Sequence, residues 1–188
     1  MALKSTIYKA QLQLSDLDRQ VYGEYGLTLA LHPSETPERL GIRLLAFALR
    51  VPSDEQRGAL QFARGLSATD EPDLWQHDLS GQVVQWVEVG QPDERRLLKA
   101  CGRSEAVVLY VYGSAAAIWW AGIRSKLIRL SKLAVWQIPA EQSQALASLV
   151  QRSMQWQITV QDGTVWVSMN DDSVELTPTQ LDVHAPAG

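Results

Sequence analysis

The 188-residue chain carries 17 Lys and Arg residues against 21 Asp and Glu residues, a formal net charge of -4, and 46% of its residues are hydrophobic. This length and composition predict one globular α/β domain with a continuous core and exclude an intrinsically disordered chain. The negative net charge gives no general attraction to nucleic acid, so any such contact must come from a local basic patch.

The cysteine content and the distribution of apolar residues favour a soluble cytoplasmic protein. Cys101 is the single cysteine of the sequence. This excludes an intrachain disulfide and favours a small buried side chain over a catalytic thiol. Residues 1–10 lack the apolar stretch of a signal peptide, and no apolar run approaches the roughly 20 residues that cross a bilayer. We therefore expect no contact with a membrane.

Alternating apolar and polar residues predict two strands near the start of the chain. Residues 8–14 and residues 25–31 both show the two-residue period of a half-buried strand. The turn residues at 15–18 lie between them. We expect these two strands to form an antiparallel hairpin.

The next segment predicts a helix followed by a short strand. Thr36 can cap a helix that has Pro37 in its first position, and apolar residues at helical spacing continue to about Arg50. A polar stretch then leads to residues 59–63, for which we expect a short strand.

The middle of the chain predicts a parallel crossover. Residues 106–112 form an apolar run rich in β-branched and aromatic residues, which is typical of a central strand covered on both faces. A helix at 114–123, a second buried strand at 133–138 and another helix at 140–151 follow. The order strand, helix, strand implies a right-handed connection between parallel strands.

The C-terminal part predicts a second hairpin around Asp162-Gly163, a typical two-residue turn. A further strand is expected at 174–176. We expect one domain over residues 1–182 and a loose tail at 183–188. With the turn centred on those two residues, the register predicts three facing apolar pairs: Val160 with Val165, Ile158 with Val167, and Trp156 with Met169.

Residues 70–99 contain the strongest candidates for a functional site. If 79–82 is a hairpin turn, Asp73 lies opposite Glu88 and both carboxylates share one face. Two opposed carboxylates repel each other unless a cation neutralises them, either Mg²⁺ bound through oxygen or a nearby Arg or Lys. Alternatively, residues 70–72 begin a short helix and present their acids to water. Glu88 is the best single candidate, because it interrupts an apolar strand end.

Two further acidic residues and two basic stretches could contribute to a site. Glu35 and Glu38 stand at the predicted helix start, where the helix dipole stabilises them and where Glu35 could pair with Arg39. The basic residues form two helical faces that could contact phosphate or could simply be solvated. They are Arg95, Arg96 and Lys99 in the first stretch, and Arg124, Lys126, Arg129 and Lys132 in the second.

Several short blocks in chain order carry a family resemblance. They are Met1-Ala2-Leu3-Lys4, His32-Pro33-Ser34-Glu35-Thr36, Glu38-Arg39, Asp70-Glu71-Pro72, Trp86-Val87-Glu88-Val89-Gly90, Pro92-Asp93-Glu94-Arg95-Arg96, Trp119-Trp120 and Gln161-Asp162-Gly163. Together they resemble the YaeQ family of bacterial proteins over nearly the whole chain.

The resemblance implies an α/β (α+β) fold, a mixed sheet flanked by helices with extra antiparallel hairpins, built on the PD-(D/E)XK core of restriction and repair nucleases. On that pattern Pro72-Asp73 is the PD element and Glu88 the following acid, and the helix acid is Glu35 or Glu38. The sequence departs from the pattern at Gly90, where the nucleases have a lysine that activates the attacking water. Lys99 would then be the catalytic residue that supplies the missing positive charge. Alternatively, Arg95 or Lys126 would supply it.

Two functions follow from this interpretation. The first is a Mg²⁺-binding, nuclease-like protein that cuts or binds nucleic acid, with Asp73, Glu88, Glu35 and Glu38 around the metal. Its phosphate contacts would come from local basic residues, namely Arg95, Arg96 and Lys126. The second is a non-catalytic module that keeps the nuclease scaffold and contacts a protein partner.

Overall fold

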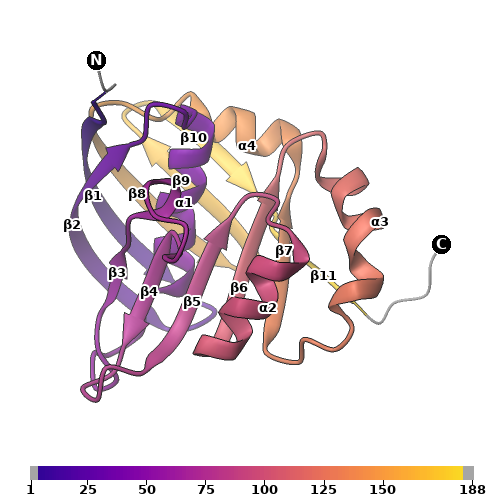
Figure 1. The fold of residues 1–188 in the computed structure, drawn as a ribbon. Coiled ribbons are helices and arrows are strands. Elements are labelled where there is room, and N and C mark those ends of the chain that lie inside the picture. The colour runs from indigo at the N-terminus through magenta and orange to yellow at the C-terminus, as the bar shows by residue number, and fades with distance from the viewer. Residues whose placement is uncertain (1–3, 184–188) are drawn as a thin grey trace.

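A computed structural model describes residues 4–183 of the chain (Figure 1). Within that range the strands form two sheets, and both mix parallel with antiparallel neighbours. The five-stranded sheet has the order β10 (Asp172–Leu176), β9 (Thr164–Met169), β8 (Ser153–Gln161), β1 (Thr6–Asp16), β2 (Val21–Leu31). The six-stranded sheet has the order β11 (Thr179–Leu181), β7 (Leu133–Ile138), β6 (Ser104–Tyr112), β5 (Val83–Val89), β4 (Leu74–His77), β3 (Leu60–Phe62).

The helices separate and cover the two sheets. Helix α1 (Pro37–Arg50) lies between them and packs against β5 and against α4 (Ala140–Ala147) (Figure 1). Its residues 40–48 are all buried, as expected for a helix with packing partners on every side. Helix α2 (Glu94–Arg103) packs against β6 and lies next to α3 (Ala116–Leu127). The mixed α+β class is therefore confirmed, but with two sheets where one was expected.

The core follows this layering. Its largest hydrophobic cluster joins both sheets through α1 and includes Leu12 of β1, Leu44 of α1 and Val108 of β6. The opposite face of β6 contributes Leu109 to a separate cluster with Leu97 of α2. Successive residues of β6 thus face different clusters, which explains its continuous apolar run.

The predicted N-terminal hairpin is confirmed and is longer than expected. Strands β1 and β2 are antiparallel partners over 11 residues each. Their turn ends at Gln20, which has a positive φ of 57°. Burial alternates along the whole of both strands, with the more buried positions on one face. The predicted ranges, residues 8–14 and 25–31, therefore cover only part of each strand.

Helix α1 begins and ends where the sequence predicts. The Oγ1 atom of Thr36 accepts a hydrogen bond from the Arg39 amide at 3.2 Å, and Pro37 occupies the first turn. The cap satisfies one of the amides that a helix start leaves without a partner. The short strand expected at 59–63 is also confirmed, as β3.

The parallel crossover is confirmed, with shifted helix ends. Strands β6 and β7 are parallel neighbours joined by α3, and β6 lies in the interior of its sheet. Helix α3 ends at Leu127 and passes through Gly122, whose position leaves open space around a Cβ. Helix α4 ends at Ala147, four residues earlier than expected, where Ser148 begins a turn. These shifts leave the order of the elements unchanged.

The C-terminal hairpin has the predicted turn and register. Asp162 and Gly163 both have positive φ, as this type of turn requires. Two of the predicted pairs are strand partners, Val160 with Val165 and Ile158 with Val167. In the third, Trp156 and Met169 are both buried.

Three features of the fold were not predicted. Strand β1 pairs with β8 in parallel, so the first strand of the chain and a late one lie side by side (Figure 1). Strand β11 adds an edge to the six-stranded sheet by pairing with β7. A bulge between Gln76 and His77 shifts the register of β4 against β5.

None of the helices among residues 4–183 is long and apolar enough to cross a membrane. The predicted tail lies outside the described residues except for Val183.

Candidate carboxylate–arginine site

The site forms where β4 and β5 meet the start of α1. Asp73 directly precedes β4, and Glu88 is the penultimate residue of β5. The predicted hairpin between these strands is confirmed, because Trp75 is the partner of Trp86 and a turn spans residues 78–82. The alternative of a short helix after residues 70–72 is wrong, since the segment continues as a strand. The register brings both carboxylates to the same end of the sheet.

The Asp73 carboxylate is almost fully buried, with 1% of its surface exposed. Its Oδ2 atom accepts a hydrogen bond from the Val89 amide at 2.8 Å and one from Nη2 of Arg39 at 2.9 Å. The same Nη2 lies 2.8 Å from Oδ1, an ion-pair distance without hydrogen-bond geometry. Asp73 therefore links the end of β5 to helix α1.

Two arginines on successive turns of α1 neutralise Asp73 and Glu35 together. Nη1 of Arg39 donates to Glu35 at 2.9 Å, and Nη1 of Arg43 donates to the other oxygen of Glu35 at 3.1 Å. Nε of Arg43 lies 3.6 Å from Oδ1 of Asp73. The cluster contains two carboxylates and two guanidinium groups, so its formal charges balance. Buried charges persist when they are paired in this way.

The electrostatics of Arg39 agree with this geometry. Burial alone would lower the pKa of the Arg39 guanidinium, because it disfavours the charged form. The charges of Asp73 and Glu35, together with the hydrogen bonds to both, more than offset that effect and raise the pKa. Arg39 is thus held as a permanent cation between the two carboxylates.

Glu88 has a different arginine partner. One of its oxygens, Oε1, accepts hydrogen bonds from Nε of Arg96 and from Nε1 of Trp86, each at 2.8 Å. The side chain is buried, and burial raises the pKa of Glu88 above its ordinary value, although the hydrogen bond and charge of Arg96 lower it in part. The remaining donors of Arg96 bind the backbone oxygens of Thr69 at 2.9 Å and Glu71 at 2.8 Å. Arg96 therefore ties α2 to β5 and to the loop before β4.

A cleft of about 360 Å³ opens beside these groups. Its charged lining consists of Arg39, Glu88 and Arg96, and its other walls come from the loop around η1 (Gly65–Ser67) and from the turn after β5. Glu88 is the carboxylate of this lining, while both flanking charges are cationic. The cleft therefore presents a positive rim around a single buried acid.

The comparisons with known proteins agree with this architecture. A family model described as "YaeQ protein" matches residues 1–178. The chain belongs to the YaeQ family. It is 44% identical over 180 residues to the YaeQ protein of Escherichia coli (strain K12), covering 95% of this chain and 97% of that protein. It is 45% identical over 183 residues to the YaeQ protein of Salmonella typhi, covering 96% and 98%.

Solved structures of YaeQ proteins share the fold. The crystal structure of YaeQ from Xanthomonas axonopodis pv. citri superposes with a TM-score of 0.87 at 45% identity, covering 94% of this chain and 97% of that one. YaeQ from Pseudomonas syringae also gives 0.87, at 39% identity, covering 95% and 96%. The resemblance inferred from the sequence blocks is therefore confirmed at the level of the YaeQ family.

The remaining predicted site residues lie elsewhere. Glu38 accepts a hydrogen bond from Ser143 of α4 at 2.6 Å. Lys99 forms an exposed ion pair with Asp70. Arg95 and Lys126 are exposed on α2 and α3. Within residues 4–183, no three His, Cys, Asp or Glu side chains are grouped as a metal site requires. Mg²⁺ binding by the predicted acids stays a prediction.

Sequence reasoning missed part of the site. It offered Arg39 as a partner for Glu35, which is confirmed, but it did not include Arg43 or the indole of Trp86. A signal for Arg43 was present, because it follows Glu35 and Arg39 at intervals of four residues on one helical face. The sequence also predicted that Arg96 contacts phosphate, whereas in the structure Arg96 pairs with the Glu88 carboxylate.

Proposed function

We propose that this YaeQ-family chain is a non-catalytic binding protein that keeps a nuclease-like scaffold and contacts a protein partner. One observation carries the proposal. The buried carboxylates Glu35, Asp73 and Glu88 all accept hydrogen bonds from arginine side chains of the same chain. The cation that such a cluster requires is thus supplied by the chain itself.

The donor set does not fit Mg²⁺. A hard cation takes carboxylate oxygens that are free to coordinate it, in a near-octahedral arrangement. Binding to Asp73 would displace Arg39 and leave a buried guanidinium without its counter-charge, which costs several kcal/mol. At Glu88, Mg²⁺ would have to share the carboxylate with Arg96 and Trp86, which both bind Oε1.

The position of the missing lysine supports the same interpretation. Gly90 has φ of 119°, a left-handed conformation that residues with a Cβ rarely adopt. Its amide donates to the backbone oxygen of Tyr110 at 2.9 Å, which fixes this conformation at the end of β5. A lysine there would be strained, so the backbone itself is poorly suited to the nuclease motif.

The arrangement of the elements supports the nuclease-like scaffold of this proposal. It has a mixed sheet flanked by helices, with Asp73 and Glu88 at the ends of neighbouring strands and Glu35 at the start of the adjacent helix. These are the places that the PD-(D/E)XK pattern gives to its acids. We infer that arginine pairing has replaced metal binding on that framework.

Charge favours a protein over nucleic acid as the partner. The net charge of -4 opposes binding to a polyanion. Arg96, which the sequence assigned to phosphate, uses Nε, Nη1 and Nη2 on internal acceptors. Arg95 and Lys126 are exposed and do not line the cleft.

A cation titration tests this proposal. The free energy of unfolding is measured by urea denaturation with increasing Mg²⁺ and Mn²⁺, for the wild type and for Glu88→Gln. We expect both cations to change it by less than about 0.5 kcal/mol in either protein, the usual range for a surface effect. Cleavage of single- and double-stranded DNA and RNA is assayed with the same samples, and none is expected.

A Mg²⁺-dependent nuclease is the second candidate. It is favoured by the cleft of about 360 Å³ that opens directly beside Glu88. In that case a cation concentration a hundred times the dissociation constant would add roughly 2.7 kcal/mol to the free energy of unfolding by mass action. Glu88→Gln would remove most of this gain and any cleavage. That pair of results would overturn the non-catalytic proposal.

A further inference from the structure

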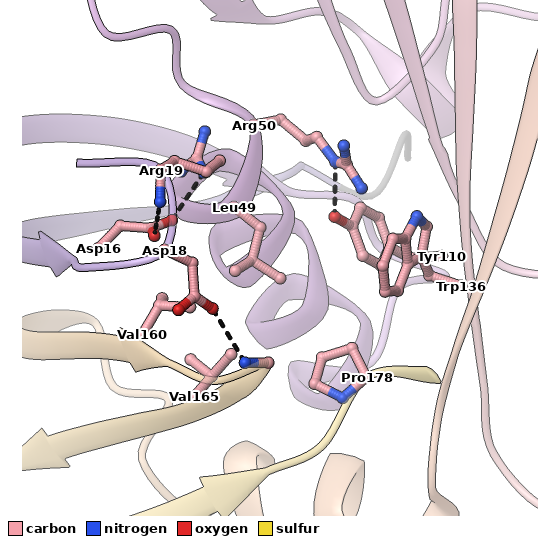
Figure 2. Close-up of a pocket in the computed structure, with 11 residues that line it drawn as sticks. Asp16, Asp18, Arg19, Leu49, Arg50, Tyr110, Trp136, Val160, Val165 and Pro178 are labelled. Carbon is pink, nitrogen blue, oxygen red and sulfur yellow. Dashed lines mark hydrogen bonds and ion pairs between the residues drawn. The ribbon is translucent and has the colours of Figure 1, made fainter. Parts of the chain in front are cut away.

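A second cavity lies between the two sheets at the C-terminal end of α1 (Figure 2). Its volume is about 180 Å³. Arg50 of α1, Tyr110 of β6 and Trp136 of β7 line one side, and Val160 of β8 and Val165 of β9 line the other. The cavity therefore depends on both sheets and on the helix between them.

This cavity is separate from the carboxylate–arginine site. Helix α1 carries Arg39 near its start and Arg50 at its end, and at 1.5 Å per residue these positions are about 16 Å apart along the axis. The two cavities share no lining residue. A ligand in the second cavity would not need the first.

Arg50 is the cation of this cavity that lacks a counter-charge. Its Nε atom donates to the Tyr110 hydroxyl at 2.8 Å, and its guanidinium lies 5.6 Å from the Tyr110 ring centroid and 5.5 Å from that of Trp136. Within residues 4–183, its two Nη atoms have no hydrogen-bond acceptor, and no carboxylate lies within ion-pair distance of them. The aromatic rings hold the guanidinium in place and leave its outer donors available.

The carboxylates near Arg50 are already engaged. Asp16 pairs with Nε of Arg19 at 2.6 Å, and Arg19 gives its other donors to the backbone oxygens of Val51 and Ala48. The two oxygens of Asp18 accept the amides of Asp162 and Gly163 at the turn after β8. Neither Asp16 nor Asp18 forms an ion pair with Arg50.

Trp136 contributes an aromatic ring to the same wall. The indole Nε1 of Trp136 is buried and has no hydrogen-bond partner in the described part of the chain. An indole N–H can only donate, and a buried donor left unpaired costs about 1–3 kcal/mol. Because this nitrogen is closed to a water-sized group, the ring of Trp136 and not its N–H forms the wall of the cavity.

The other walls are apolar. They include Leu49, Val160, Val165 and Pro178, which offer contacts to a hydrocarbon body. A volume of 180 Å³ corresponds to about six water molecules at roughly 30 Å³ each. This is below the roughly 300 Å³ at which sites for drug-sized ligands begin, so the cavity fits a small molecule with one ring.

We infer that this cavity binds a small organic carboxylate with a flat apolar body, whose carboxylate accepts hydrogen bonds from the Nη atoms of Arg50. A planar guanidinium and a carboxylate match each other in geometry and charge. The ring lies against the aromatic and aliphatic walls. The ligand supplies an acceptor for the outer donors of Arg50, which form no ion pair in the described part of the chain.

Phenylacetate and its neutral analogue phenylacetamide test the inference. Both are titrated into ¹⁵N-labelled protein, and the indole N–H resonance of Trp136, assigned by its loss in Trp136→Phe, is followed. We expect phenylacetate to shift this resonance saturably and phenylacetamide to bind at least about tenfold more weakly, since one charged hydrogen bond is worth that much. Arg50→Gln should weaken phenylacetate binding by a similar factor, and Arg50→Lys by less.

Arg152→Gln is the matched control, because Arg152 is exposed at the start of β8 and does not line the cavity. It should bind phenylacetate like the wild type. Spectral dispersion confirms that each variant is folded. Arg50→Lys, which keeps the positive charge, remains as the second variant if Arg50→Gln does not fold. The inference is overturned if Trp136 does not respond to phenylacetate, if the acid and the amide bind equally well, or if Arg50→Gln and Arg152→Gln behave alike.

Discussion

Arg39 connects two carboxylates that are both almost fully buried. Its guanidinium reaches Glu35 with one nitrogen and Asp73 with another. Arg39→Met would leave these two acids with Arg43 as their remaining cation. Breaking a buried ion pair from one side costs about 3–5 kcal/mol, because an uncompensated charge stays in the core. We expect a loss of this size in urea denaturation.

Arg95→Met is the matched control for that measurement, since Arg95 is exposed on α2. It should change the free energy of unfolding by no more than about 0.5 kcal/mol. Equal effects of the two substitutions would mean that the buried ion pairs contribute nothing specific to stability.

Glu88 should make stability depend on pH. Burial, the largest cause, raises its pKa above the ordinary value of 4.5. Between that value and the folded-state pKa, the folded protein binds more protons than the unfolded chain, so stability falls as pH rises. The contribution of protonated Glu88 to the stability of the fold is complete below pH 4.5 and is lost as pH rises through its folded-state pKa.

Glu88→Gln isolates this effect, because glutamine resembles the protonated acid and does not titrate. Urea denaturation from about pH 4 to pH 8 should show the wild type losing stability relative to the variant as pH rises. A constant difference between the two proteins across this range would contradict the raised pKa.

Contacts between site residues could be predicted from the sequence where local structure, such as a hairpin, fixes which side chains face each other. Asp73 and Glu88 could be placed together because a hairpin fixes which residues face each other. The pairing of Arg43 with Asp73 could not be inferred, because it depends on how α1 is rotated against the sheet. Arg96 reaches Glu88 only because the chain reverses at Gly90, which sets the distance between α2 and β5.

At the scale of elements, local sequence signals predicted the hairpins. Pairings between strands far apart in the sequence could not be predicted. The β8–β9 hairpin has its turn and its alternation within one short segment, and both agree. The parallel pairing of β1 with β8 places Ala10 opposite Met154. Residues so far apart in the sequence are not joined by a turn, so no local signal predicts their contact. This pairing places β8 in the sheet of β1 and β2. Because the pairing could not be predicted, a single sheet was expected.

The two faces of this hairpin should differ in their contribution to stability. Trp156 of β8 is 1% exposed and donates its Nε1 to the backbone oxygen of Leu149 at 3.1 Å. Trp166 of β9 is only partly buried. Trp156→Ala should cost roughly 3–5 kcal/mol, as for a fully buried aromatic residue. Trp166→Ala should cost less than half as much, and chemical denaturation of both variants compares them directly.

A loss below about 0.5 kcal/mol for Trp156→Ala would be that of a surface position. It would contradict the placement of this face of β8 in the core. A larger loss for Trp166→Ala than for Trp156→Ala would have the same meaning, because it would exchange the buried and exposed faces of the hairpin.

For the whole molecule, the position of α1 makes the two sheets interdependent. Both sheets pack their inner faces on this helix, and one hydrophobic cluster contains residues of all three layers. The parallel contact of β1 with β8 further ties the start of the chain to a strand that follows the six-stranded sheet in sequence. Neither sheet can lose its packing without exposing α1, so the two should unfold as one cooperative unit.

Two leucines test this cooperativity from opposite layers. Leu12 of β1 and Leu74 of β4 are both buried in the cluster around α1, one in each sheet. Leu12→Ala and Leu74→Ala should each lower the free energy of unfolding by about 2–5 kcal/mol. In both variants, far-ultraviolet circular dichroism and tryptophan fluorescence should follow one transition with one midpoint. If either variant showed two separate transitions, the sheets would be independent units, and α1 would belong to the core of only one of them.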